Sequence, residues 1–149
     1  MIGIAFIGCQ QQSVELAPLD LLSYGLPIKV NAPAGAKVKA DDLGIAKDVT
    51  IQDSVSGYNL QIFESAATSL DSKNITAELK TEAEASSFFD EIIKSDEEGF
   101  IYKKVIDENY INYDFRHVKV RGDKQYVFRA GLSRQYTLEE IETMYNSVL

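Results

Sequence analysis

The chain has 149 residues, of which 45% are hydrophobic and 26% are charged, a composition typical of a globular domain long enough to bury its own core. Its 23 Asp and Glu residues outnumber its 15 Lys and Arg residues. The resulting net charge of −8 argues against nucleic acid as a partner, because phosphate binding needs clustered cations. A single cysteine excludes an internal disulfide and a cysteine-based metal cluster, and we expect neither a metal site nor a cofactor.

The apolar stretch MIGIAFIG runs directly into the only cysteine, Cys9. FIGC resembles the lipobox of a bacterial lipoprotein signal, with Gly8 at the small position, although Phe6 replaces the usual leucine and no basic residue precedes it. The resemblance implies that residues 1–8 are the remnant of a signal that begins upstream, and that Cys9 carries acyl chains such as palmitate. We therefore expect a lipid anchor in a bacterial envelope membrane. The alternative is that Met1 is the true start, with Cys9 buried in a first strand and the protein cytoplasmic.

A polar segment separates this start from the rest of the chain. QQQSVE has no strand periodicity, which predicts a tether over residues 9–17 and a single domain over residues 18–149. Within the domain, the apolar piece PLDLLSY predicts a helical turn over residues 18–24 that is closed by Gly25.

Alternating apolar residues then predict antiparallel strands in two groups. The strands are expected over residues 26–33, 36–40, 47–53 and 58–65, and again over residues 99–107, 110–120 and 124–131. The turn RGDK between the last two predicts a tight hairpin, because glycine accepts a positive φ. Its Arg-Gly-Asp tripeptide matches an integrin-binding motif, but the turn geometry accounts for it.

Between the two groups the alternation is lost, which predicts a long helix beginning near Asp71. Its apolar residues recur at helical spacing, and SDEEG should end it with Gly99 in the left-handed conformation. The residues of this predicted apolar face are Ile75, Leu79, Ala83, Phe88, Phe89, Ile92 and Ile93.

A second helix is predicted after Thr137, which forms a capping box with Glu140. Its apolar face should pack on the sheet. The order of elements implies an α+β fold: an antiparallel sheet of about six to seven strands, packed by the long central helix and the C-terminal helix.

This layout resembles the PsbP-like fold, through the early hairpin, the stretch FFDEIIKSDEEGFIY, the aromatic three-stranded return and the closing TLEEIETM helix. That family includes extrinsic photosystem subunits and Ran-binding import factors. The start CQQQ is similar to small envelope lipoproteins of Bacteroidetes-type bacteria. These resemblances imply a binding or assembly module, and they carry over no site residue.

His117 is the only histidine, and it lies in a predicted strand. Catalysis would need a nucleophile or an acid held next to it, and no spacing in the sequence identifies one. We therefore expect no catalytic residue. A hydrolase with an atypical site around His117 stays as an alternative.

Two further features concern modification and binding. DSV resembles the O-glycosylation acceptor motif of exported Bacteroidetes-type proteins, which would place a sugar on Ser54. The return strands mix aromatic residues with cations, and a cationic face would suit an acidic partner. Its candidate residues are Lys103, Arg116, Lys119 and Arg129.

The sequence therefore predicts a lipid-anchored envelope protein that acts as a non-catalytic binding or assembly module. Its expected partners are a membrane, through the anchor, and an envelope protein. A small cytoplasmic adaptor is the alternative if Met1 begins the protein.

Overall fold

The structure, a computed structural model, describes residues 15–132 and 134–149. Within these residues the chain forms two short-to-medium helices, one 3-10 turn and two sheets. The strands are β1 (Leu16–Asp20), β2 (Lys29–Pro33), β3 (Lys37–Asp42), β4 (Lys47–Asp53), β5 (Tyr58–Ala66), β6 (Phe89–Ser95), β7 (Gly99–Asp107), β8 (Tyr110–Arg121) and β9 (Lys124–Ala130). The helices are η1 (Leu22–Tyr24), α1 (Ser72–Glu84) and α2 (Leu138–Asn146).

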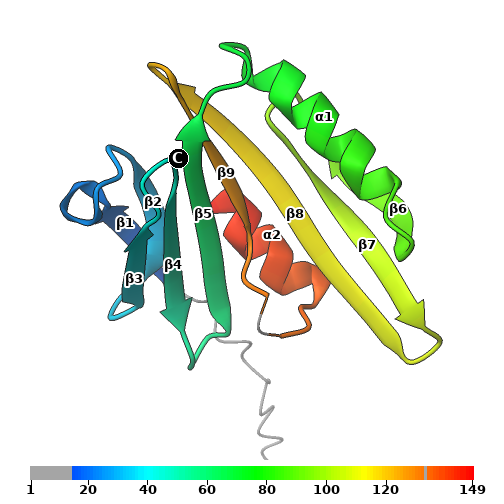
Figure 1. The fold of residues 1–149 in the computed structure, drawn as a ribbon. Coiled ribbons are helices and arrows are strands. Elements are labelled where there is room, and N and C mark those ends of the chain that lie inside the picture. The colour runs from blue at the N-terminus through cyan, green and yellow to red at the C-terminus, as the bar shows by residue number, and fades with distance from the viewer. Residues whose placement is uncertain (1–14, 133) are drawn as a thin grey trace, which may run out of the picture.

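Seven strands form one antiparallel sheet in the order β3-β4-β5-β9-β8-β7-β6, and β1 pairs with β2 in a separate two-stranded sheet. α1 packs against β6, β7 and β8, whereas α2 packs against β5, β7 and β8. Figure 1 shows the two helices on opposite faces of the large sheet. The expected α+β class and the antiparallel sheet of about seven strands are confirmed.

Strand alternation gives each face of the sheet its own core. The larger core lies beneath α2 and the β1–β2 hairpin, and burying each of its large side chains contributes roughly 1.5–3 kcal/mol. Its fully buried members include Leu21, Leu26, Val30, Leu60, Ile62, Phe115, Phe128 and Ile141. The smaller core lies under α1 and comprises Ala83, Phe100 and Tyr102, with Leu79, Phe89 and Ile92 packed against it.

The β1–β2 hairpin is fastened to the end of α2. The Asn31 N–H donates to the Ser147 carbonyl at 2.8 Å, and Val30 forms a β-bridge with Val148. From β5, the Tyr58 hydroxyl donates to the Asn31 carbonyl at 2.8 Å and lies 2.9 Å from Ser147 Oγ. Burial raises the pKa of Tyr58 to about 12, so this phenol keeps its proton at neutral pH.

The predicted long helix is wrong in its second half. α1 ends at Glu84, a turn follows over residues 85–88 with Phe88 exposed, and Phe89–Ser95 form the edge strand β6. β6 pairs with β7 through two register shifts, between Phe89 and Glu91 and between Ile92 and Lys94. Such bulges place an extra residue in the strand, so two side chains three positions apart face the same side. Phe89 and Ile92 therefore both reach the core under α1, at a spacing that resembles a helical one.

Gly99 does not cap a helix in the left-handed conformation; it begins β7. A Cβ atom at this position would lie 2.7 Å from the Arg116 carbonyl oxygen and 2.7 Å from the Tyr145 hydroxyl. Glycine is required here because the neighbouring strand and α2 approach the backbone closely.

The start of the domain also differs from the prediction. Residues 18–20 belong to β1, and only residues 22–24 form the expected turn, which Gly25 closes with φ +88°. β1 also includes Leu16 and Ala17, which were assigned to the tether. Pro18 argues against a strand because proline lacks a backbone N–H, but proline is tolerated on an edge strand such as β1.

The other strands and the predicted cap at Thr137 agree with the structure, with strand ends shifted by a few residues at most. The RGDK segment forms a two-residue hairpin with Gly122 at φ +60°. Thr137 and Glu140 form the capping box of α2, and Ile141, Met144 and Tyr145 face the sheet.

The bulges in β6 predict that two neighbouring isoleucines contribute differently to the free energy of unfolding. Ile92 packs on the core under α1, whereas the Ile93 side chain is 36% exposed. We expect Ile92→Ala to lower the free energy of unfolding by about 1–2 kcal/mol and Ile93→Ala to lower it by less than about 0.5 kcal/mol. Urea unfolding of the two variants measures both values. Similar losses at both positions would instead support a helix that buries both side chains.

Candidate functional site

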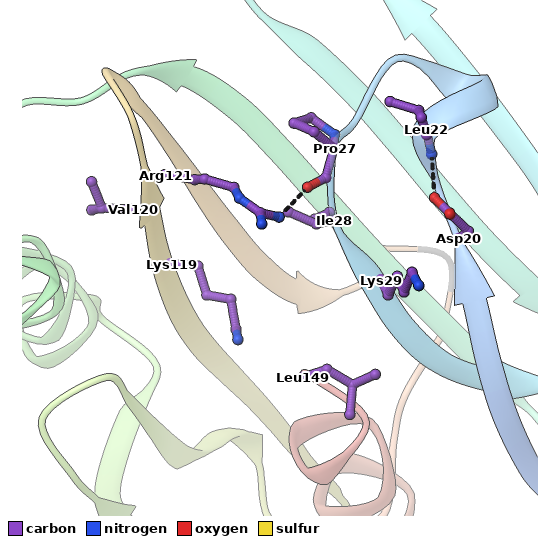
Figure 2. Close-up of a pocket in the computed structure, with 9 residues that line it drawn as sticks. All are labelled: Asp20, Leu22, Pro27, Ile28, Lys29, Lys119, Val120, Arg121 and Leu149. Atoms are coloured by element: carbon purple, nitrogen blue, oxygen red, sulfur yellow. Dashed lines mark hydrogen bonds between the residues drawn. The ribbon is translucent and has the colours of Figure 1, made fainter.

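A groove of about 800 Å³ lies between the β1–β2 hairpin and the end of β8 (Figure 2). It brings together side chains from the hairpin, from β8 and from the end of the chain. The lining residues are Asp20, Leu22, Pro27, Ile28, Lys29, Lys119, Val120, Arg121 and Leu149.

The cations of the groove come from two elements. Lys119 and Arg121 are two positions apart on β8, so they share the face of the sheet that the hairpin covers. Lys29 begins β2, across the groove. The Arg121 Nη1 donates to the Pro27 carbonyl, and this contact joins the hairpin to the end of the sheet.

The side chains that line the groove carry a net charge of +2, from Lys29, Lys119 and Arg121 against Asp20. In the part of the chain that the structure describes, neither Lys29 nor Lys119 forms an ion pair. Asp20 lies opposite Lys29 in the β1–β2 register, but its Oδ1 accepts from the Leu22 N–H at 2.9 Å. A local excess of positive charge in a chain of net charge −8 favours an anionic ligand at this place.

The four cations predicted to form one surface lie on two faces of the sheet. Lys103 and Lys119 pair with Tyr113 and Tyr126 in the register, which places them on the face of α2. Arg116 pairs with Phe100 of the core under α1, and Arg129 points to that same side. The expected single surface is therefore wrong, because successive side chains of a strand alternate between faces.

Two of these four cations are paired with carboxylates within the domain. The Lys103 Nζ lies 3.6 Å from Asp90, and the Arg116 Nη1 donates to the Asp114 carboxylate at 3.0 Å. The buried Asp114 also lies 3.7 Å from the Lys104 Nζ. Of the four predicted residues, only Lys119 faces the groove.

Asp114 accepts a third contact, from the Tyr102 hydroxyl at 3.2 Å. Burial first, and then the charge of Asp114, raises the pKa of Tyr102 to about 12. Arg129 lies opposite Gln61 in the β5–β9 register. The Nε of Arg129 and the Oε1 of Gln61 are both buried and have no partner among the described residues, although they are complementary as donor and acceptor.

His117 packs among aromatic rings on the α2 face. Its ring centroid lies 6.0 Å from that of Phe128 and 5.2 Å from that of Tyr145. Its Nδ1 is buried without a hydrogen-bond partner in the described part of the chain. Burial, and to a smaller extent Lys119, lowers the pKa of His117 to about 4, against an opposing effect of Asp96. The imidazole is therefore neutral at pH 7.

A hydrolytic site at His117 would need a nucleophile hydrogen-bonded to the imidazole. The hydroxyl of Tyr145, whose ring packs on the imidazole, instead donates to Asp96. Burial first, and then this contact, raises the pKa of Tyr145, so the phenol is a poor nucleophile at neutral pH. The groove does not include His117.

Ser54 lies exposed in the turn between β4 and β5, as its predicted modification requires. In the same turn the Ser56 Oγ donates to Asp53 at 2.6 Å, which lowers the pKa of that carboxyl. The proposed lipid attachment residue, Cys9, lies outside the described residues.

The described residues contain no helix long and apolar enough to cross a bilayer, and no group of three or more side chains placed to hold a metal ion. No protein-family model matches the chain, and no curated protein is detectably similar to it.

Sequence reasoning missed Lys29 and Arg121 as members of the site. The two-residue spacing of Lys119 and Arg121 places both on one face of the strand, and this signal could have identified Arg121. Nothing in the sequence places Lys29 beside them, because the hairpin reaches β8 only through tertiary packing.

The lowered pKa of His117 predicts an acid-sensitive stability. The imidazole stays neutral in the fold down to about pH 4, whereas the unfolded chain binds the proton near pH 6.5. The associated stability is therefore present above pH 6.5 and is lost as the pH falls from 6.5 to about 4. We expect His117→Gln to reduce this loss by roughly 1–3 kcal/mol, a range discounted for partial exposure.

Urea unfolding at pH 7.5 and pH 4.5 tests this for both proteins. The carboxyl groups are common to both, so the difference isolates the imidazole. An identical pH dependence in the two proteins would contradict the prediction.

Proposed function

We propose that this protein is a lipid-anchored, non-catalytic binding module of a bacterial cell envelope, which takes up an anionic ligand in the groove between the β1–β2 hairpin and β8. The lipobox-like FIGC at residues 6–9 and the polar QQQSVE after it support the anchor. The groove supports the binding role.

The observation that carries the binding role is the set of cations in the groove. Lys29 and Lys119 have no ion-pair partner within residues 15–132 and 134–149, whereas other cations of the sheet are paired with carboxylates. The only acidic side chain on the lining, that of Asp20, accepts a hydrogen bond from the Leu22 N–H at the start of η1. This chemistry attracts and holds an anion.

A PsbP-like fold is part of the proposal. Strands, a helix, further strands and a closing helix follow in that order, which supports the resemblance. The short α1, followed by β6, departs from the long central helix on which the resemblance partly rested. The family's binding and assembly roles agree with a ligand groove, although fold alone is a weak guide to function.

Removing the two free ammonium groups should weaken anion binding. We expect the double variant Lys29→Gln/Lys119→Gln to bind inorganic phosphate about thirtyfold more weakly than the parent, because each of the two charges contributes about 1 kcal/mol near the surface. NMR titration at about 10 mM ionic strength, where screening is weak, measures this loss.

Lys37→Gln is the matched control, since Lys37 is an exposed lysine of β3 that does not line the groove. It should leave the phosphate affinity unchanged. An equal loss of phosphate affinity in the double variant and in Lys37→Gln would refute the groove as an anion site.

The anchor is tested at Cys9. Expressed from the complete reading frame in a bacterium that processes lipoproteins, the parent should sediment with membranes. Cys9→Ala should release a folded protein into the soluble fraction, because several acyl chains are needed for stable attachment. A parent that is unlipidated and soluble would contradict the anchor and favour the cytoplasmic adaptor.

A further inference from the structure

The groove is more apolar than an inorganic anion requires. Five of its nine lining residues are apolar. Two of them remain strongly exposed to solvent, Leu22 at 65% and Leu149 at 49%. A small anion held by the ammonium groups would leave these side chains in water, whereas an apolar ligand group would cover them.

We infer that the groove binds an anionic amphiphile, a molecule that carries a carboxylate or phosphate at one end of an apolar chain. This inference rests on the proposed function and adds the chemical class of the ligand. The volume of about 800 Å³ lies within the range of sites that enclose small organic molecules, roughly 300–1,000 Å³.

The positions of the side chains give the ligand a direction. Figure 2 shows Lys29 and Lys119 on either side of one space, with Leu149 next to it and Leu22 near the opposite end of the hairpin. The carboxylate of Asp20 lies beside Lys29 in the register and repels a ligand anion there. The anionic group therefore lies closer to Lys119 and Arg121, and the chain extends over the apolar residues of the hairpin.

The three cations of the groove, Lys119 and Arg121 of β8 and Lys29 of β2, have different roles in this arrangement. Arg121 is held by the Pro27 carbonyl, so it contributes charge in a fixed position. The two lysines are free to adjust, and a compact ammonium group accepts either a carboxylate or a phosphate. The groove therefore favours a ligand with a negative charge next to an apolar chain, and the binding measurements below distinguish a carboxylate headgroup from a phosphate headgroup.

Isothermal titration calorimetry of the full chain with four soluble probes tests the inference. Octyl phosphate should bind at least about tenfold more tightly than inorganic phosphate, because its chain removes apolar surface from water. It should also bind at least about tenfold more tightly than octanol, which lacks the charge. Octanoate is the fourth probe. If octanoate binds more tightly than octyl phosphate, the ligand is assigned to fatty acids; if octyl phosphate binds more tightly, it is assigned to phosphate esters. Either result supports the inference.

Single variants separate the two parts of the site. Leu22→Ser should weaken octyl phosphate severalfold and leave inorganic phosphate unchanged, whereas Lys119→Gln should weaken both. Leu43→Ser is the matched control, since Leu43 is 59% exposed in the β3–β4 turn and away from the groove. Leu43→Ser should change neither affinity. Because the Leu22 side chain is exposed, we expect Leu22→Ser to fold like the parent, and circular dichroism checks this.

The failures of the two proposals differ. Equal affinities for inorganic phosphate and octyl phosphate would overturn the amphiphile and leave the anion site standing. Binding of octanol as tight as that of octyl phosphate would overturn the anionic character of the ligand. Absence of binding by every probe would overturn both proposals.

Discussion

The docking of the β1–β2 hairpin on the end of α2 is the constraint on which the groove depends. The hairpin shares no strand pairing with the seven-stranded sheet; it is held by the Val30–Val148 bridge, by the hydrogen bonds among Asn31, Tyr58 and Ser147, and by buried side chains. Because these contacts join the first strands to the last residues of the chain, the groove exists only in the complete fold. Arg121 closes the arrangement from β8 by donating to the hairpin backbone.

The distribution of charge separates structural cations from available ones. On the face that α1 partly covers, the buried Asp114 contacts Lys104, Arg116 and Tyr102, and these groups satisfy one another. Burying a charged carboxylate without such partners would cost free energy of folding, so we assign this cluster a structural role in the sheet. The lysines at the groove have no comparable partner in the described residues. A chain of net charge −8 therefore still has lysines without an ion-pair partner at the proposed anion groove, within its described residues.

Local patterns predicted most of the strands and both helix starts correctly, because alternation and capping act over a few residues. They failed at β6, where two bulges give an edge strand the spacing of a helix. They failed again at β1, where Pro18 reads as a break although an unpaired edge tolerates it. The candidate site was predicted only at Lys119. Alternation along the strands alone shows that Arg116 points to the face opposite to that of Lys119. Whether a helix or the hairpin covers a given face, or whether solvent contacts it, depends on contacts between segments far apart in the chain.

The sequence by itself determined the α+β class, the antiparallel strands, the RGDK hairpin and the capped C-terminal helix, since each follows from periodicity or turn chemistry within a short window. It also supplies the lipobox-like start that motivates an envelope location. Tertiary structure decided where the hairpin lies, which cations form ion pairs with carboxylates of the sheet and which residues meet at the groove. Those outcomes depend on burial and on contacts between segments more than 80 residues apart, such as Tyr58 with Ser147. No local pattern encodes such contacts, because the free energy that selects them comes from packing the whole core at once.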